Sequence, residues 1–114
     1  MEQSLPLADI EEVVVYWRPG CGFCGSLLRD LDRLGVTYRQ VNIWDVPGAA
    51  EVVRSFARGH ETVPTVVMGR VGLVNPSAHE VLAVAAVHAS ASVPVGYEPP
   101  EPGRFSSWLN SKLH

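Results

Sequence analysis

This sequence has few cysteines, no excess of positive charge and no long apolar run, and each of these features excludes a class of protein. Two cysteines in 114 residues are too few for the disulfide framework of a small secreted domain. A formal net charge of −3 gives no reason to expect nucleic acid or an anionic membrane as a partner. No run approaches the ~18 consecutive apolar residues of a membrane-spanning helix, so we expect none.

The N-terminal residues Met1–Ser4 lack the basic region and apolar segment of a secretion signal. We therefore expect a cytoplasmic protein, in a compartment that keeps thiols reduced. With 46% apolar and 18% charged residues, the chain has the composition of an ordinary globular domain and is long enough to bury its own core.

Hydrophobic periodicity predicts strands that alternate with helices. Asp45 and Pro47 mark the start of the second helix, and Gly59 marks its end. Ser77 and Glu80 match the S-x-x-E capping box at the start of the last helix. The predicted β-α-β-α-β-β-α order occupies, in turn, residues 12–17, 22–34, 36–43, 45–59, 65–68, 71–74 and 77–89.

This element order predicts an α/β fold with a central four-stranded mixed sheet flanked by helices. Strands joined through helices run parallel, whereas the Gly69–Arg70 turn joins an antiparallel pair. We expect one domain over residues 1–92 and a Pro-rich C-terminal extension over residues 93–114. Near its end, three apolar residues recur at helical spacing: Phe105, Trp108 and Leu109. Three interpretations of this segment stay open: a short helix packed on the domain, a mobile tail, or a segment that docks a partner.

The two cysteines lie between the first strand and the first helix, in the segment R-P-G-C-G-F-C. Cys21 falls at the helix start, where unpaired N–H groups and the helix dipole stabilise a thiolate and lower its pKa. Arg18 adds a nearby positive charge with the same effect. Cys24, one turn further along, is placed to resolve a mixed disulfide formed on Cys21. This placement favours a redox pair with Cys21 as the nucleophile.

The alternatives to a redox pair are a zinc site, a structural disulfide and two inert buried thiols. A zinc site needs about four ligands, and a disulfide across this short loop gains little chain entropy. A Gly-rich turn after a strand argues against inert thiols. We therefore predict no metal site, although the chain has four histidines: His60, His79, His88 and His114.

A second motif, E-T-V-P-T over residues 61–65, precedes the third predicted strand. Pro64 donates no ladder hydrogen bond, so it belongs at a strand's first residue or at an edge. A cis bond before Pro64 would turn the backbone of Val63 outward, where it can pair with an extended ligand. The alternative is a trans proline that merely begins the strand, but beside the cysteine pair we predict cis.

These two motifs in this element order resemble the glutaredoxin branch of the thioredoxin superfamily, over about residues 12–90. Within that branch, the segments 42–45, 59–67 and 75–77 are similar to the actinobacterial glutaredoxin-like proteins called mycoredoxins. The resemblance implies a thioredoxin fold, a nucleophilic Cys21 and a resolving Cys24.

The resemblance also implies that the Thr62-Val63-Pro64 segment contacts a bound thiol. Arg18 stands where the family often has a basic residue, and Phe23 stands where it has an aromatic between the cysteines. Thioredoxins carry W-C-G-P-C, whereas this chain has Gly20 before Cys21 and Phe23 before Cys24, which favours the less reducing glutaredoxin range.

The segment after the hairpin departs from glutathione-using glutaredoxins, which usually carry a G-G-x-D-like turn. Here Asn75, Pro76 and Ser77 supply no acid to face the ammonium group of glutathione. Asn75 and Ser77 remain candidate binding residues, and the missing acid favours mycothiol, a sugar-based thiol, over glutathione. Trp44 either flanks the thiol groove or packs in the core, and we favour the core, because a large aromatic next to Ile43 is most often a packing residue.

The predicted function is a monomeric thiol–disulfide oxidoreductase that reduces mixed disulfides between proteins and a low-molecular-weight thiol. That thiol, mycothiol or glutathione, is a co-substrate, and no cofactor is bound. The protein partners are thiolated or disulfide-bonded. Three alternatives remain open: a thioredoxin-like protein disulfide reductase, a carrier of a [2Fe–2S] cluster and a non-catalytic binding module.

Overall fold

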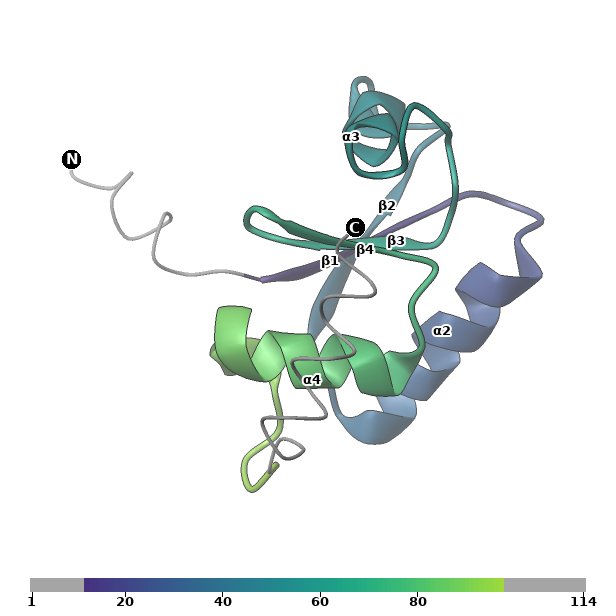
Figure 1. Ribbon diagram of the computed structural model, residues 1–114. Coiled ribbons are helices and arrows are strands. Elements are labelled where there is room, and N and C mark those ends of the chain that lie inside the picture. Colours follow the sequence, from purple (N-terminus) through teal and green to yellow (C-terminus); the bar gives the residue numbers. More distant parts are fainter. Residues whose placement is uncertain (1–11, 98–114) are drawn as a thin grey trace, which may run out of the picture.

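A four-stranded sheet with the spatial order β2-β1-β3-β4 forms the middle layer of the computed structural model, which describes residues 12–97 (Figure 1). Strand β1 (Val13–Trp17) pairs in parallel with β2 (Tyr38–Asn42). On its other side β1 pairs antiparallel with β3 (Thr65–Met68), which pairs antiparallel with β4 (Val71–Val74). The mixed sheet and its hairpin confirm the predicted fold class.

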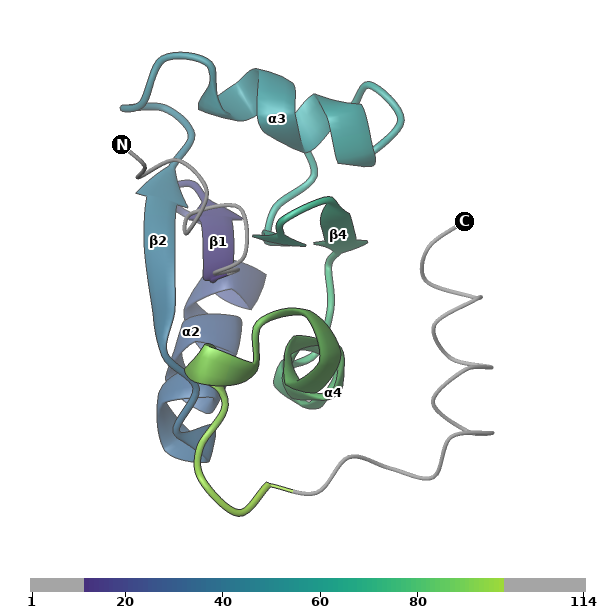
Figure 2. The ribbon, with the colours of Figure 1, turned by 90° about the vertical axis from the view of Figure 1, so that its left-hand side faces the viewer.

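Helices cover both faces of the sheet (Figures 1 and 2). Helices α2 (Gly22–Leu34) and α4 (Ala78–His88) lie on one face, and α3 (Ala49–Phe56) lies on the other. A short 3₁₀ turn, Ser90–Ser92, follows α4, and the carbonyl of Ser92 accepts a hydrogen bond from the N–H of Thr37 at 2.9 Å. That bond ties the end of α4 to the beginning of β2.

Successive side chains of a strand point to opposite faces of the sheet, so the buried residues form one cluster on each face. Val13 and Val15 are fully buried toward α2 and α4, whereas Tyr16 packs on the α3 side. On the α3 side Phe56 lies directly over Gly72 of β4, where any side chain would overlap the Phe56 ring. The sheet is therefore covered on both faces, although Arg39 and Gln40 in the middle of the edge strand β2 stay exposed.

The start of α3 corrects the sequence prediction. Asp45 and Pro47 lie in a turn, and α3 begins at Ala49, after Gly48 in a left-handed conformation (φ 85°). The reason is local, because the side chain of Asn42 hydrogen-bonds Asp45 and the backbone of the turn, which holds the chain out of the helix. The helix also ends earlier than Gly59, at Phe56.

The division of the chain after residue 92 stays a prediction. Val93 and Tyr97 pack against the core, and the apolar residues at the chain's end lie outside the described residues. Within residues 12–97, no helix has the length and apolar character needed to cross a membrane.

Candidate active site

The register of the sheet brings four distant segments to one edge. Tyr16 stands opposite Thr65, so the segment before β3 lies beside the loop after β1. Thr65 also stands opposite Val74, which brings the end of β4 to the same place, and Trp17 stands beside Asn42 at the end of β2. Because β1 and β2 end here while β3 begins, the loops after β1, β2 and β4 surround the segment that precedes Thr65.

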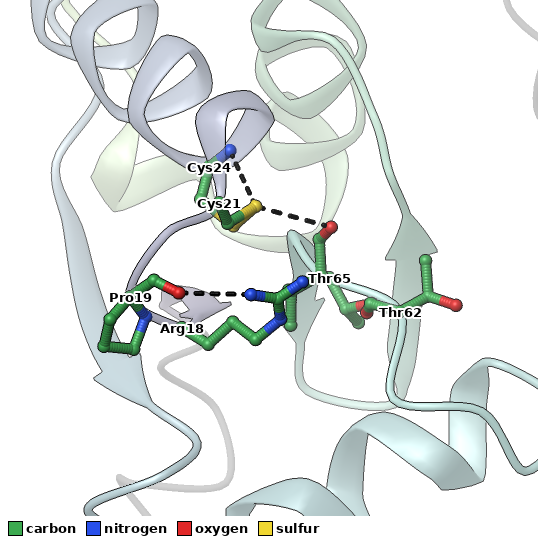
Figure 3. Close-up of a disulfide and its surroundings, with 7 residues drawn as sticks. Arg18, Pro19, Cys21, Cys24, Thr62 and Thr65 are labelled. Carbon is green, nitrogen blue, oxygen red and sulfur yellow. Dashed lines mark hydrogen bonds between the residues drawn. A yellow bond between two sulfur atoms is a disulfide. The ribbon is translucent and has the colours of Figure 1, made fainter.

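Cys21 occupies the N-cap position of α2, and its sulfur accepts a hydrogen bond from the N–H of Cys24 at 3.1 Å (Figure 3). The two cysteines form a disulfide, with Cα atoms 5.2 Å apart, within the ordinary range. Cys21 is partly exposed, whereas Cys24 is 1% exposed. The sulfur that a substrate can reach is therefore that of Cys21.

The surroundings of Cys21 favour negative charge on its sulfur. In the reduced protein, the Cys24 N–H and the positive end of the α2 dipole would both stabilise a thiolate. The first turn of α2 contains no acidic residue to oppose them. The guanidinium of Arg18 donates to the carbonyl of Pro19 at 3.1 Å, which places a positive charge in the same loop.

The carbonyl oxygen of Val63 lies 3.7 Å from the sulfur of Cys21, an approach drawn as a dashed line from Cys21 in Figure 3. The Val63–Pro64 bond is cis. A disulfide sulfur has no proton, so this approach is a contact rather than a hydrogen bond in the oxidised state. The hydroxyl of Thr65, which is fully buried, donates to the carbonyl of Thr62 at 2.7 Å. This bond fixes the turn that presents Val63 to Cys21.

The backbone of Asn75 is tied to the same edge, and Ser77 follows it at the start of α4. The N–H of Asn75, whose φ is 53°, donates to the carbonyl of Pro64 at 2.8 Å. Ser77 caps α4, and its hydroxyl accepts the N–H of Glu80 at 3.1 Å. In return the carboxylate of Glu80 accepts the N–H of Ser77 at 2.9 Å, which confirms the predicted capping box.

Trp44 corrects the expectation of a core residue, because its side chain is 64% exposed. The N–H of Trp44 donates to the side chain of Asn42 at 2.9 Å, and this turn directs Ile43 into the core and Trp44 outward. The Arg18 guanidinium lies 5.8 Å from the centre of its ring, a cation–π arrangement. Phe23, also predicted, is 73% exposed beside the disulfide.

Sequence reasoning also missed the residues that support the 62–65 turn. Glu61 forms an ion pair with Arg54 of α3, which anchors the turn at its first end. The buried hydroxyl of Thr65 anchors the other end, and a polar residue at the start of an apolar strand was the available signal. Among residues 12–97, no three histidine, cysteine or acidic side chains gather to hold a metal ion.

The sequence model of the glutaredoxin family matches residues 13–72 of this chain, which is more than half of its length. The chain belongs to the glutaredoxin family. A protein of Mycobacterium tuberculosis whose name assigns it to the glutaredoxins is 39% identical over 72 residues, covering 62% of this chain and 86% of that protein. Family and site together make this glutaredoxin a thiol–disulfide oxidoreductase.

Solved structures agree with this family. A glutaredoxin from Archaeoglobus fulgidus is 27% identical with a TM-score of 0.53, and the match covers 68% of this chain and 88% of that one. A wheat glutaredoxin is 17% identical with a TM-score of 0.50, and the match covers 80% of this chain and 85% of the wheat chain. This likeness shows the shared fold.

The hydrogen bond from Thr65 predicts the effect of one substitution. Thr65→Val keeps the shape of the side chain but leaves the Thr62 carbonyl without its donor, so we expect the free energy of unfolding to fall by about 1 kcal/mol. The same change at exposed Thr37 is the control, with an expected effect within about 0.5 kcal/mol. Urea titration of both variants measures the difference, and equal stability of the two would show that the Thr65 bond contributes nothing.

Proposed function

We propose that this glutaredoxin reduces mixed disulfides between proteins and a low-molecular-weight thiol, with mycothiol favoured over glutathione. One observation carries the proposal: the partly exposed Cys21 sulfur, at the N-cap of α2, faces the Val63 carbonyl at 3.7 Å. A backbone group beside the reactive sulfur offers a place for the amide of a small thiol to pair as a strand would.

In the first step, the Cys21 thiolate attacks the sulfur of the small thiol in the mixed disulfide. The bond between the small thiol and the target protein breaks, and the target leaves as a thiolate that takes a proton from water. The small thiol is now linked to Cys21. The two electrons that reduce the target come from the Cys21 thiolate.

Two routes remove the small thiol from Cys21, and only the first returns the enzyme directly to its reduced state. A second molecule of the small thiol attacks the small-thiol sulfur of the mixed disulfide, which forms the free disulfide of the thiol and restores Cys21. Alternatively, Cys24 attacks the sulfur of Cys21, releases the small thiol and forms the intramolecular disulfide seen here. Cys24 lies one turn along α2 and is nearly buried, which suits attack from within the protein.

The different positions of the two sulfurs predict different effects of serine substitution. Cys21→Ser removes the cysteine sulfur that is open to substrate and should abolish turnover, a loss of at least about 10³-fold. Cys24→Ser keeps the first step and the route through a second thiol, so it should retain release of the target. The measurement is the rate of target release from one model protein carrying the small thiol, with wild type alongside. Activity of Cys21→Ser would overturn the assigned roles.

The choice of thiol is tested with the wild-type protein. One model target carries either mycothiol or glutathione, and kcat/KM for its release is compared with the same free thiol present in each assay. We expect mycothiol to be preferred, because none of the residues Asn75–Ser77 is an acid that could face a glutathione ammonium, and the nearby Glu80 carboxylate is already engaged by the N–H of Ser77. Such a partner is worth up to about 3 kcal/mol if buried. A preference for glutathione would reject this part of the proposal.

A further inference from the structure

The turn after β2 places an exposed aromatic side chain against the loop that precedes Cys21. The Arg18 guanidinium lies 5.8 Å from the centre of the Trp44 ring. The turn itself is fixed, because the N–H of Trp44 donates to the side chain of Asn42. Since β1 and β2 are parallel neighbours, Asn42 stands beside Trp17 at their ends. The sheet register therefore brings Trp44 to Arg18, the residue after Trp17.

The Arg18 side chain lies over the backbone of its own loop. Its Nη1 donates to the carbonyl of Pro19 at 3.1 Å, and Figure 3 shows the guanidinium turned back toward Pro19. A Cβ atom placed on Gly20 would lie 3.9 Å from the same nitrogen. Because Gly20 directly precedes Cys21, the guanidinium nitrogen lies within about 9 Å of the Cys21 Cα atom.

No neighbouring carboxylate neutralises the charge of Arg18. Within residues 12–97 Arg18 forms no ion pair, and the first turn of α2 contains no acidic residue. The acidic residues on the other segments around the site are each engaged by a partner: Asp45, Glu61 and Glu80. At about 9 Å a cation near a protein surface still attracts a thiolate. Arg18 therefore adds to the stabilisation that the start of α2 provides.

The strength of this attraction depends on where the guanidinium spends its time. A long side chain at a surface has many rotamers that point into solvent, and holding it in one of them costs conformational entropy. A cation–π contact at an exposed site favours the held rotamer by about two- to fivefold. The ring of Trp44 supplies such a contact, in addition to the hydrogen bond that Arg18 donates to the Pro19 carbonyl.

We propose that Trp44 is a positioning residue: its ring holds the Arg18 guanidinium over the loop before Cys21, where the positive charge favours the attacking thiolate. The inference rests on the proposed role of Cys21 as the nucleophile. Trp44 acts through Arg18, so loss of either side chain should weaken the same effect.

The test measures the pKa of Cys21 in the reduced full-length chain with Cys24→Ser. The pKa comes from the pH profile of alkylation by iodoacetamide, a neutral reagent that reacts with the thiolate. Arg18→Gln removes the charge, whereas Trp44→Leu removes the aromatic face and keeps an apolar side chain. Trp44→Phe keeps an aromatic face. Arg33→Gln, in the last turn of α2, is the matched control for the loss of an arginine charge.

We expect Arg18→Gln to raise the pKa of Cys21 by about 0.5 and Trp44→Leu to raise it by about 0.3. Trp44→Phe should recover most of that difference. In a chain that already carries Arg18→Gln, Trp44→Leu should have no further effect, because the two residues act as a unit. Arg33→Gln should leave the pKa unchanged, since about 17 Å of helix separates it from Cys21, more than the screening length in physiological salt.

Three results would overturn the inference: an unchanged pKa in Arg18→Gln, an unchanged pKa in Trp44→Leu, or the same rise in Trp44→Leu with and without Arg18. Because Trp44 is exposed, its variants should fold, and thermal unfolding verifies this. Target release judges the proposed function separately. If the pKa of Cys21 responds as expected but no target is released, the charge is positioned as inferred and only the proposed function fails.

Discussion

The hydrogen bond from the N–H of Cys24 to the sulfur of Cys21 is the interaction on which the chemistry of this protein depends. It places the sulfur at the positive end of α2, in the position that serine or aspartate takes in most helices. A helix cap made of sulfur is a weak cap when protonated and a strong one when ionised. The fold therefore favours the ionised state of Cys21, which is the attacking state in the proposed mechanism.

The sheet register gives that sulfur its surroundings. Because β3 runs antiparallel to β1, the Val63 carbonyl reaches Cys21 across 42 residues of sequence. The same register brings Asn75 to Pro64 and leads into the first turn of α4. The ion pair between Glu61 and Arg54 holds one end of the intervening turn, and the buried hydroxyl of Thr65 holds the other end. One sheet edge thus carries both the sulfur that we propose to be reactive and the groups that we propose to meet a bound thiol.

Features that depend on a few neighbouring residues could be predicted from the sequence. The Ser77–Glu80 capping box and the position of Cys21 at the start of α2 are of this kind, since a cap is decided within about one turn. Alternation of apolar residues likewise predicted the order of strands and helices. The same local patterns, together with the two motifs, pointed to the glutaredoxins.

Features that depend on side chains bonding across a turn could not be predicted. An apolar residue such as Trp44 next to Ile43 indicates a core position, but Trp44 lies exposed in a turn where its N–H donates to the side chain of Asn42. That turn also delays α3 to Ala49.

The pKa of Cys21 in the reduced protein tests the central claim most directly. The thiolate can be titrated by its ultraviolet absorbance in the Cys24→Ser variant, where Cys21 is the only cysteine left. Stabilisation of the thiolate by the helix start predicts a pKa below about 7.5, against about 8.5 for a free thiol. A pKa at or above about 8.5 would show that the start of α2 does not activate Cys21.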